Sequence, residues 1–268
     1  MQGDNSIRAQ QLKKMEALYE IDRICKKHSL RFFLDYGSLI GAARHKGYIP
    51  WDDDIDLGMP IKDYRKFIKI AKTELSDNFF LQTYKTDKGY FLPFLKIRIN
   101  NTCDLFIPWK HIKMHHGLSL DIFPVFPLSN IRFLRKLQIK FGILYKISFG
   151  GRTLSGSSKG VKILAKILSV FPKGFIGALL YPFFALSSEK KAKYFSHITE
   201  EPRGFFKKET IFPLENIKFE DGFFPAPKDF HTYLTSLYGD YLTPPPEEDR
   251  HCHEGFIVDL YNSYEKYI

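Results

Sequence analysis

The chain has 268 residues, of which 44% are hydrophobic and 16% aromatic, so it can bury a sizeable core and is not an intrinsically disordered protein. Its 40 Lys and Arg exceed its 30 Asp and Glu, for a net charge of +10. That surplus indicates a polyanionic neighbour: nucleic acid, an anionic membrane or a phosphorylated substrate. The three cysteines are too few and too scattered for a disulfide framework. With no secretory signal pattern and no uncharged apolar run of ~18 residues, we expect a cytoplasmic protein.

The first half of the chain alternates between helical and extended patterns. Apolar periodicity predicts helices over 7–28, 39–44 and 62–75, and strands over 31–35, 54–59, 91–100 and 118–123. Pro124 and Pro127 are expected to end the last of these strands. This mixture favours an α+β (mixed α/β) fold.

After residue 131 the character of the chain changes, because Lys and Arg become interleaved with bulky apolar residues. We therefore predict three parts: a catalytic core over 1–130, a basic amphipathic helical segment over 131–195, and a C-terminal part over 196–268 that completes the catalytic domain. Helices of the basic segment can lie in an anionic membrane interface. The alternative is an ordinary helical subdomain with a solvated basic face.

An acidic cluster marks the candidate site. Four carboxylates lie within five residues, at Asp52, Asp53, Asp54 and Asp56. Like charges this close repel by on the order of 1 kcal/mol per pair even in water, so a cation must offset them. On a strand Asp54 and Asp56 would share a face, and two such oxygen ligands suit Mg²⁺. Asp121, on the strand predicted over 118–123, is the candidate third carboxylate.

Two other interpretations of the acidic cluster compete with a magnesium site. A solvated acidic loop is the commonest fate of such a run, but Trp51 and the alternating apolar residues after Asp54 indicate burial. A calcium loop starting at Asp52 would need Gly at its sixth position, where Leu57 stands.

A phosphate-binding element is expected just upstream. Gly37 allows close approach of the backbone to a ligand, and Ser38 can cap a helix whose N–H groups face an anion. Arg44 and His45 add positive charge near the same pocket, although a solvated basic turn is the alternative interpretation.

The stretch LDYGSLIGAARHKGYIPWDDDIDLGM (Leu34 to Met59) resembles the defining motif of the LicD family. That family is known for phosphocholine transferases, is similar to the fukutin-type transferases and sits in the nucleotidyltransferase superfamily. Further matches are LKIRINNT (95–102), GLSLDIFPVFPL (117–128), FEDGFFPAPKDF (219–230) and YGDYLTPPPEE (238–248). The resemblance implies a nucleotidyltransferase-like core sheet with flanking helices, into which the basic segment is inserted.

The resemblance also implies roles for individual residues. Asp54, Asp56 and Asp121 would be the catalytic metal ligands, holding two Mg²⁺ ions, with Mn²⁺ as the alternative ion. The groups expected to bind the donor phosphates are Gly37, Ser38, Arg44, His45, Lys96 and Arg98. Additional contributions are expected from Asp52, Asp53, Tyr238, Asp240 and Glu247.

The expected reaction is transfer of a phosphoryl-linked group, typically phosphocholine from CDP-choline. The acceptor would be a hydroxyl of a cell-surface glycan or its lipid-linked precursor at the inner face of the cell membrane, with release of CMP. One alternative is a nucleotidyltransferase that attaches a nucleoside monophosphate to a small molecule or sugar. Another is a non-catalytic membrane-associated protein of the same fold. Nucleic acid is not an expected partner, because no known reading module is present.

Overall fold

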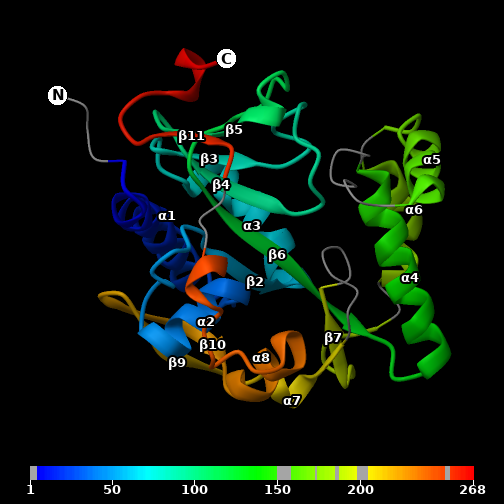
Figure 1. The fold of residues 1–268 in the computed structure, drawn as a ribbon. Coiled ribbons are helices and arrows are strands. Elements are labelled where there is room, and N and C mark those ends of the chain that lie inside the picture. The colour runs from blue at the N-terminus through cyan, green and yellow to red at the C-terminus, as the bar shows by residue number, and fades with distance from the viewer. Residues whose placement is uncertain (1–4, 150–157, 173, 185–186, 198–204, 251–253) are drawn as a thin grey trace.

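The computed structural model describes residues 5–149, 158–172, 174–184, 187–197, 205–250 and 254–268 (Figure 1). Its helices are α1 (Ile7–Lys27), α2 (Tyr36–His45), α3 (Ile61–Glu74), α4 (Arg132–Ser148), α5 (Lys159–Leu168), α6 (Phe175–Phe184), α7 (Lys208–Ile211) and α8 (Phe230–Tyr238). Its strands are β1 (Phe33–Leu34), β2 (Asp56–Pro60), β3 (Phe79–Gln82), β4 (Leu95–Ile99), β5 (Cys103–Phe106), β6 (Ser119–Leu128), β7 (Tyr194–Ser196), β8 (Phe206–Lys207), β9 (Leu214–Phe219), β10 (Gly222–Pro227) and β11 (Phe256–Asp259). The predicted α+β class is confirmed.

A mixed sheet of seven strands forms the centre of the described structure. Its main order is β1-β2-β6-β4-β3, and β7 continues from β6 to β8. Strands β2 and β6 run parallel, whereas the other neighbours are antiparallel. The two strands expected to carry acidic ligands are therefore direct neighbours, so their side chains can meet.

The core lies on the face of the sheet opposite to these acids. Along a strand side chains alternate between faces, so Leu57 and Ile122 point away from the aspartates that precede them. Both are fully buried, together with Leu18 and Ile21 on the apolar face of α1. The predicted helix over 7–28 is confirmed as α1, and that over 62–75 as α3.

Strand β6 is longer than expected, because Pro124 and Pro127 do not end it. The Asp121 N–H points toward β2, where it donates to the Ile55 carbonyl, so by alternation the nitrogen of Pro124 points toward β4. Pairing with β4 has already ended at Ile122, so no ladder hydrogen bond is lost there. The same alternation aims Pro127 toward β2, whose pairing ends at Val125. Beyond that point β6 pairs with β7, in which Phe195 is the partner of Pro127. A proline is tolerated at strand positions whose nitrogen makes no ladder hydrogen bond.

The basic segment forms a small helical unit, α4 to α6, at one side of the sheet (Figure 1). Its apolar cluster continues into β6 through Phe126 and Leu128. Residues 129–188 contain ten Lys and Arg and no Asp or Glu, so the net +10 of the chain resides in this segment. None of the helices in the described part of the chain combines the length and apolar character that a membrane span needs. The Gly- and Ser-rich stretch GGRTLSGSSKG (150–160), which the sequence suggests is a linker within the unit, lies outside the described residues at 150–157.

The C-terminal part returns to the sheet of the first part. It forms the hairpin β9–β10, which was not predicted and which packs against β1 and α2. Strand β11 pairs with β5 at the opposite end of the molecule (Figure 1). The boundaries proposed for the three parts stay predictions.

Gly58 in β2 tests how tightly the acid-bearing face of the sheet is packed, because it shares that face with Asp56. A Cβ atom at Gly58 would lie 2.4 Å from Phe33 Cζ and 2.7 Å from Asp35 Oδ2. We expect Gly58→Ala to lower the free energy of unfolding by about 1–3 kcal/mol through overpacking, as measured by urea denaturation. The matched control is Gly160→Ala in α5, where a Cβ would meet nothing within 4 Å. Equal stability of the Gly58 variant and wild type would contradict this packing.

Candidate active site

Two neighbouring strands bring Asp56 and Asp121 side by side. In the parallel pairing of β2 with β6, Asp56 is the direct partner of Asp121, and across the next ladder Asp121 is the partner of Lys96. Partners in adjacent strands point to the same face, so the sheet carries a row of acid, acid and base. The structure thus brings together two of the three predicted ligands.

The backbone of Asp56 is held on both sides by the first turn of α2, Asp35 to Ser38, which we call the Gly-Ser turn. Its N–H donates to Ser38 Oγ at 2.8 Å, and its carbonyl accepts from the Asp35 N–H at 2.9 Å. A Cβ at Gly37 would lie 2.8 Å from Asp52 Oδ2, so a side chain there would crowd the acidic turn. Ser38 is not the helix cap that was expected: α2 begins at Tyr36 and is capped by Asp35, whose carboxylate accepts from the Tyr36 N–H.

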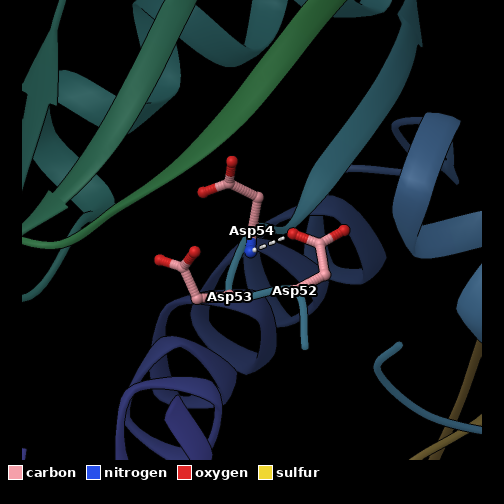
Figure 2. A group of neighbouring side chains, drawn as sticks. All are labelled: Asp52, Asp53 and Asp54. Carbon is pink, nitrogen blue, oxygen red and sulfur yellow. Dashed lines mark hydrogen bonds between the residues drawn. The ribbon is translucent and has the colours of Figure 1, made fainter. Parts of the chain in front are cut away.

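Asp52, Asp53 and Asp54 occupy the turn that leads into β2 (Figure 2). Each offers a carboxylate oxygen within 4.8 Å of the others, and among the described residues no other group of three acids, cysteines or histidines is this close. Asp52 Oδ1 accepts from the Asp54 N–H at 3.2 Å, which shapes the turn. Since β2 begins only at Asp56, Asp54 does not share a strand face with it, contrary to expectation. Asp54 instead lies in the loop just before the strand.

Lys14 of α1 is the counter-ion of this turn, and the sequence analysis missed it. Its ammonium group lies 2.8 Å from Asp53 and 3.4 Å from Asp54, and its side chain is 0% exposed. Burial would lower the pKa of Lys14, but Asp54, Asp104 and Asp53 outweigh it and raise the pKa well above its ordinary value. The available signal was a lysine one residue before Met15, within the apolar face of a predicted helix.

Asp56 is the carboxyl group of the site whose ionised form is most disfavoured by its surroundings. Burial, followed by the charges of Asp54 and Asp121, raises the pKa of Asp56 well above its ordinary value. No hydrogen bond or ion pair reaches its carboxylate from any described residue, although the group is only half-buried. A carboxylate in this setting fits a divalent cation, which would supply the missing positive charge to Asp54, Asp56 and Asp121.

Lys96 and Arg98, both expected to bind donor phosphates, have different surroundings. The Lys96 ammonium donates to both oxygens of Asp121, at 2.6 and 2.8 Å. Arg98 is 5% exposed, and its guanidinium donates to Gln82 Oε1 and to the Gly117 carbonyl. Arg98 therefore braces the sheet, and the expectation that it contacts the donor is not supported. Lys96 remains beside the acids.

A second basic group gathers around Trp51, on the other side of the acidic turn. Arg44 donates to the Tyr241 carbonyl at 3.3 Å, and Arg250 lies over the Trp51 ring at 4.8 Å. Burial and the nearby Arg250 lower the pKa of Arg44, and burial and Arg44 lower that of His45. Tyr241 and Arg250, neither of which was predicted, thereby bring the C-terminal segment against Arg44 and Trp51.

The other C-terminal candidates contribute less. Asp240 is exposed and caps its own turn by accepting from Thr243. Tyr238 is exposed at the end of α8, and Glu247 faces solvent with a long 3.7 Å ion pair to Arg250. The structure does not bring Tyr238, Asp240 or Glu247 into contact with the acidic row.

An aromatic wall adjoins the row of acids. Phe123 follows Asp121 by two residues on β6, so both side chains lie on one face of the sheet. Its ring centroid lies 4.5 Å from that of Phe94 and 5.1 Å from that of Tyr36. Lys96 Nζ lies 5.7 Å from the Phe94 ring centroid. We call Tyr36, Phe94 and Phe123 the aromatic wall.

Beneath the Gly-Ser turn lies a buried polar cluster that the sequence analysis also missed. Asp35 accepts from the Tyr233 hydroxyl at 2.8 Å, and its other oxygen lies 3.0 Å from His197 Nε2. All three side chains are buried. Tyr233 lies 198 positions from Asp35 in the sequence and His197 is also distant, so no local pattern could reveal the cluster. It fixes Asp35, and through Asp35 the start of α2 and the carbonyl of Asp56.

Removing the charge of Asp56 tests this electrostatic description. We expect Asp56→Asn to raise the free energy of unfolding in EDTA at neutral pH by on the order of 1 kcal/mol, because a repulsive charge is lost. Mg²⁺ should then stabilise the wild type but not the variant. Thermal unfolding with and without Mg²⁺ measures both effects. Asp77→Asn, in an exposed turn, is the control; a destabilised Asp56→Asn protein in EDTA would contradict the description.

Comparison with known proteins finds similar sequences over most of the chain. A family model described as LicD/FKTN/FKRP, nucleotidyltransferase domain, matches residues 29–136. Lipopolysaccharide cholinephosphotransferase LicD of Haemophilus influenzae is 26% identical over 268 residues, covering 94% of this chain and 98% of that protein. Ribitol 5-phosphate transferase FKRP, from human and mouse, is 26% identical over 102 residues, or 38% of this chain and 18% of FKRP.

The matched region contains every element that builds the acidic row. It begins just before β1, includes the Gly-Ser turn, the acidic turn, β2, β4 and β6, and ends within α4. Lys14 and the buried partners of Asp35 lie outside it. Residues 29–136 of this chain therefore match the nucleotidyltransferase domain of the LicD/FKTN/FKRP family.

Proposed function

We propose that this protein is a Mg²⁺-dependent transferase that moves a phosphoryl-linked group from a CDP-linked donor to a hydroxyl of a glycan, releasing CMP. The observation that carries the proposal is the register of Asp56 with Asp121, reinforced by the unpaired, strained charge of Asp56. The family relationship supports it, because the named relatives are phosphocholine and ribitol phosphate transferases.

Phosphoryl transfer depends on positioning and charge neutralisation, and each residue of the site would have a separate role in it. Asp54, Asp56 and Asp121 would hold Mg²⁺, with Mn²⁺ as a substitute, and the metal would neutralise the donor diphosphate and acidify the attacking hydroxyl. Lys96 is placed to turn from Asp121 toward a phosphate oxygen. Arg44 would bind the donor from the other side of the turn, since guanidinium groups pair well with phosphates.

Phosphocholine is the transferred group that we favour. The aromatic wall lies directly beside the acidic row, and trimethylammonium groups bind to aromatic faces by cation–π attraction. A polyol phosphate such as ribitol phosphate carries no cation and would gain nothing from these rings. The full-length similarity to a cholinephosphotransferase points the same way.

We also propose that the protein works at the inner face of the cell membrane, on a lipid-linked glycan. The α5–α6 face, defined as Ile163, Ile167, Val170, Phe175 and Leu179, is strongly exposed although all its members are apolar. Lysines at 159, 162 and 166 accompany it, and the surrounding segment has no acidic residue. Apolar residues flanked by lysines suit an anionic lipid surface.

A nucleotidyltransferase is the alternative that uses the same carboxylates. It would cleave a nucleoside triphosphate and attach the nucleoside monophosphate to its acceptor, so the reaction products separate the two proposals. A non-catalytic protein is disfavoured, because an uncompensated carboxylate at Asp56 costs stability without a cation.

Loss of either paired aspartate should abolish turnover. We expect Asp56→Asn and Asp121→Asn each to reduce CMP release from CDP-choline with Mg²⁺ by on the order of 10³-fold, because several kcal/mol of charge stabilisation depends on the metal. Asp77→Asn should retain wild-type rates. The same assay with CDP-ribitol and nucleoside triphosphates identifies the donor. Wild-type turnover in both aspartate variants would refute the assignment, and faster turnover of a triphosphate would favour the alternative.

Membrane contact is tested by flotation with anionic liposomes. We expect Lys162→Gln/Lys166→Gln to weaken binding roughly 30-fold, since each lysine near such a surface contributes about 1 kcal/mol. The control is Lys110→Gln/Lys113→Gln, a pair of exposed lysines in the segment between β5 and β6. Binding that is indifferent to anionic lipid, or equally weakened by both pairs, would rule out the α5–α6 face as the docking surface.

A further inference from the structure

A cavity of about 530 Å³ lies between α3, the segment before β4, strand β6, and helices α4 and α6. This volume falls within the ~300–1,000 Å³ typical of small-molecule sites. The cavity is separate from the acidic row, and the proposed chemistry makes no use of it. Its walls differ in character from the floor to the mouth.

The floor of the cavity is apolar and buried. Its main side chains are Tyr64, Phe126 and Phe184, each less than a tenth exposed, with Ile61 and Tyr145 packed around them. Apart from the Tyr64 and Tyr145 hydroxyls, these rings and aliphatic chains carry no polar atoms, so they favour a hydrocarbon chain.

The mouth of the cavity is cationic. Arg65, Lys69 and Lys72 lie at i, i+4 and i+7 on one face of α3, and Lys85 faces them from the segment after β3. All four are exposed, and the lining contains no acidic residue. None of the ion pairs found among the described residues involves any of them. The Arg65 guanidinium is positioned over the Tyr181 ring, 4.2 Å from its centroid.

One residue joins the cavity to the candidate active site. Phe94 lines the cavity, and its ring also contacts Phe123 of the aromatic wall, at 4.5 Å between centroids. Lys96, the partner of Asp121, lies 5.7 Å from the same ring centroid. A molecule held in the cavity would therefore lie behind the aromatic wall, within one side chain of the reacting groups.

We propose that this cavity binds a lipid phosphate, meaning a phosphate ester on a single long hydrocarbon chain. The chain would occupy the apolar floor, and the phosphate would lie at the mouth against Arg65, Lys69 and Lys85. Charge complementarity selects an anionic head, because four cations with no acid among them repel a cationic one and give a neutral one no advantage. The proposal deepens the proposed function, on which it rests, by assigning the lipid end of the acceptor to a defined site.

The probe for this site is decyl phosphate below its micelle concentration, titrated into the full chain by calorimetry. Decyl glucoside tests the chain without the charge, and inorganic phosphate tests the charge without the chain. We expect decyl phosphate to bind at least tenfold more tightly than either. Equal affinity for decyl phosphate and decyl glucoside, or for decyl phosphate and inorganic phosphate, would overturn the proposal.

Two pairs of variants locate the binding. Ala178→Trp fills the cavity from an exposed position on α6, whereas Leu179→Trp places the same ring on the neighbouring residue, outside the lining. Arg65→Gln/Lys69→Gln removes two cations of the mouth, and the control Lys62→Gln/Lys66→Gln removes two others from the same helix. The first member of each pair should weaken decyl phosphate binding at least tenfold, and the second should leave it unchanged. Similar losses in both members would reject the site.

The outcome does not depend on turnover of the donor. The Asp56→Asn protein should bind decyl phosphate like wild type even though its transferase activity is lost. Ala178→Trp should still release CMP from CDP-choline at the wild-type rate with a water-soluble sugar acceptor. Absence of lipid phosphate binding with normal CMP release would refute the cavity assignment alone, whereas absence of CMP release with normal binding would refute the proposed function alone.

Discussion

The main physical constraint on this structure is the mutual repulsion of five carboxylates that lie close together at one edge of the site. Asp56 and Asp121 are forced together by strand register, and the acidic turn adds Asp52, Asp53 and Asp54 directly in front of them. Only two lysines approach this group among the described residues: Lys14 serves the turn, and Lys96 serves Asp121. Asp56 is left with a raised pKa and no counter-charge, so a divalent cation is the natural complement.

The rest of the core serves to hold that charge in position. The Asp56 backbone is bonded on both sides by the Gly-Ser turn, and Asp35 of that turn is fixed by Tyr233 and His197 from the distant C-terminal part. These buried contacts tie the C-terminal part to the turn that positions Asp56, although it lies beyond the matched family domain.

Charge is divided unevenly between the helical unit and the rest of the chain. Outside residues 129–188 the chain has 30 basic and 30 acidic residues, so the helical unit holds the entire surplus. Asp56 and Asp121 lie in the sheet, and the helical unit lies beside it (Figure 1). Under the proposed function, the cations and exposed apolar side chains of the helical unit would face the membrane. A lipid-linked acceptor would then be held at the membrane while its glycan reaches the donor.

Much of this was predictable from local sequence, and the exceptions have physical causes. The acidic motif and the alternating apolar residues indicated the two strands that carry Asp56 and Asp121, because side-chain alternation is a local property. Arg98 could not be distinguished from Lys96, since two residues of one strand face look alike until their neighbours are known. Lys14, His197 and Tyr233 carry no motif, because their roles arise from tertiary contacts. The course of β6 through Pro124 depended on where β4 ends, which only the assembled sheet reveals.

The most direct test of the central claim is a crystal structure with Mn²⁺ and an unreactive CDP-choline analogue, located by anomalous scattering. The account predicts manganese between Asp56 and Asp121, with a ligand from Asp54, and Lys96 moved from Asp121 to a phosphate of the donor. Manganese bound elsewhere, with Lys96 still paired to Asp121 and no ion within reach of Asp56, would contradict it.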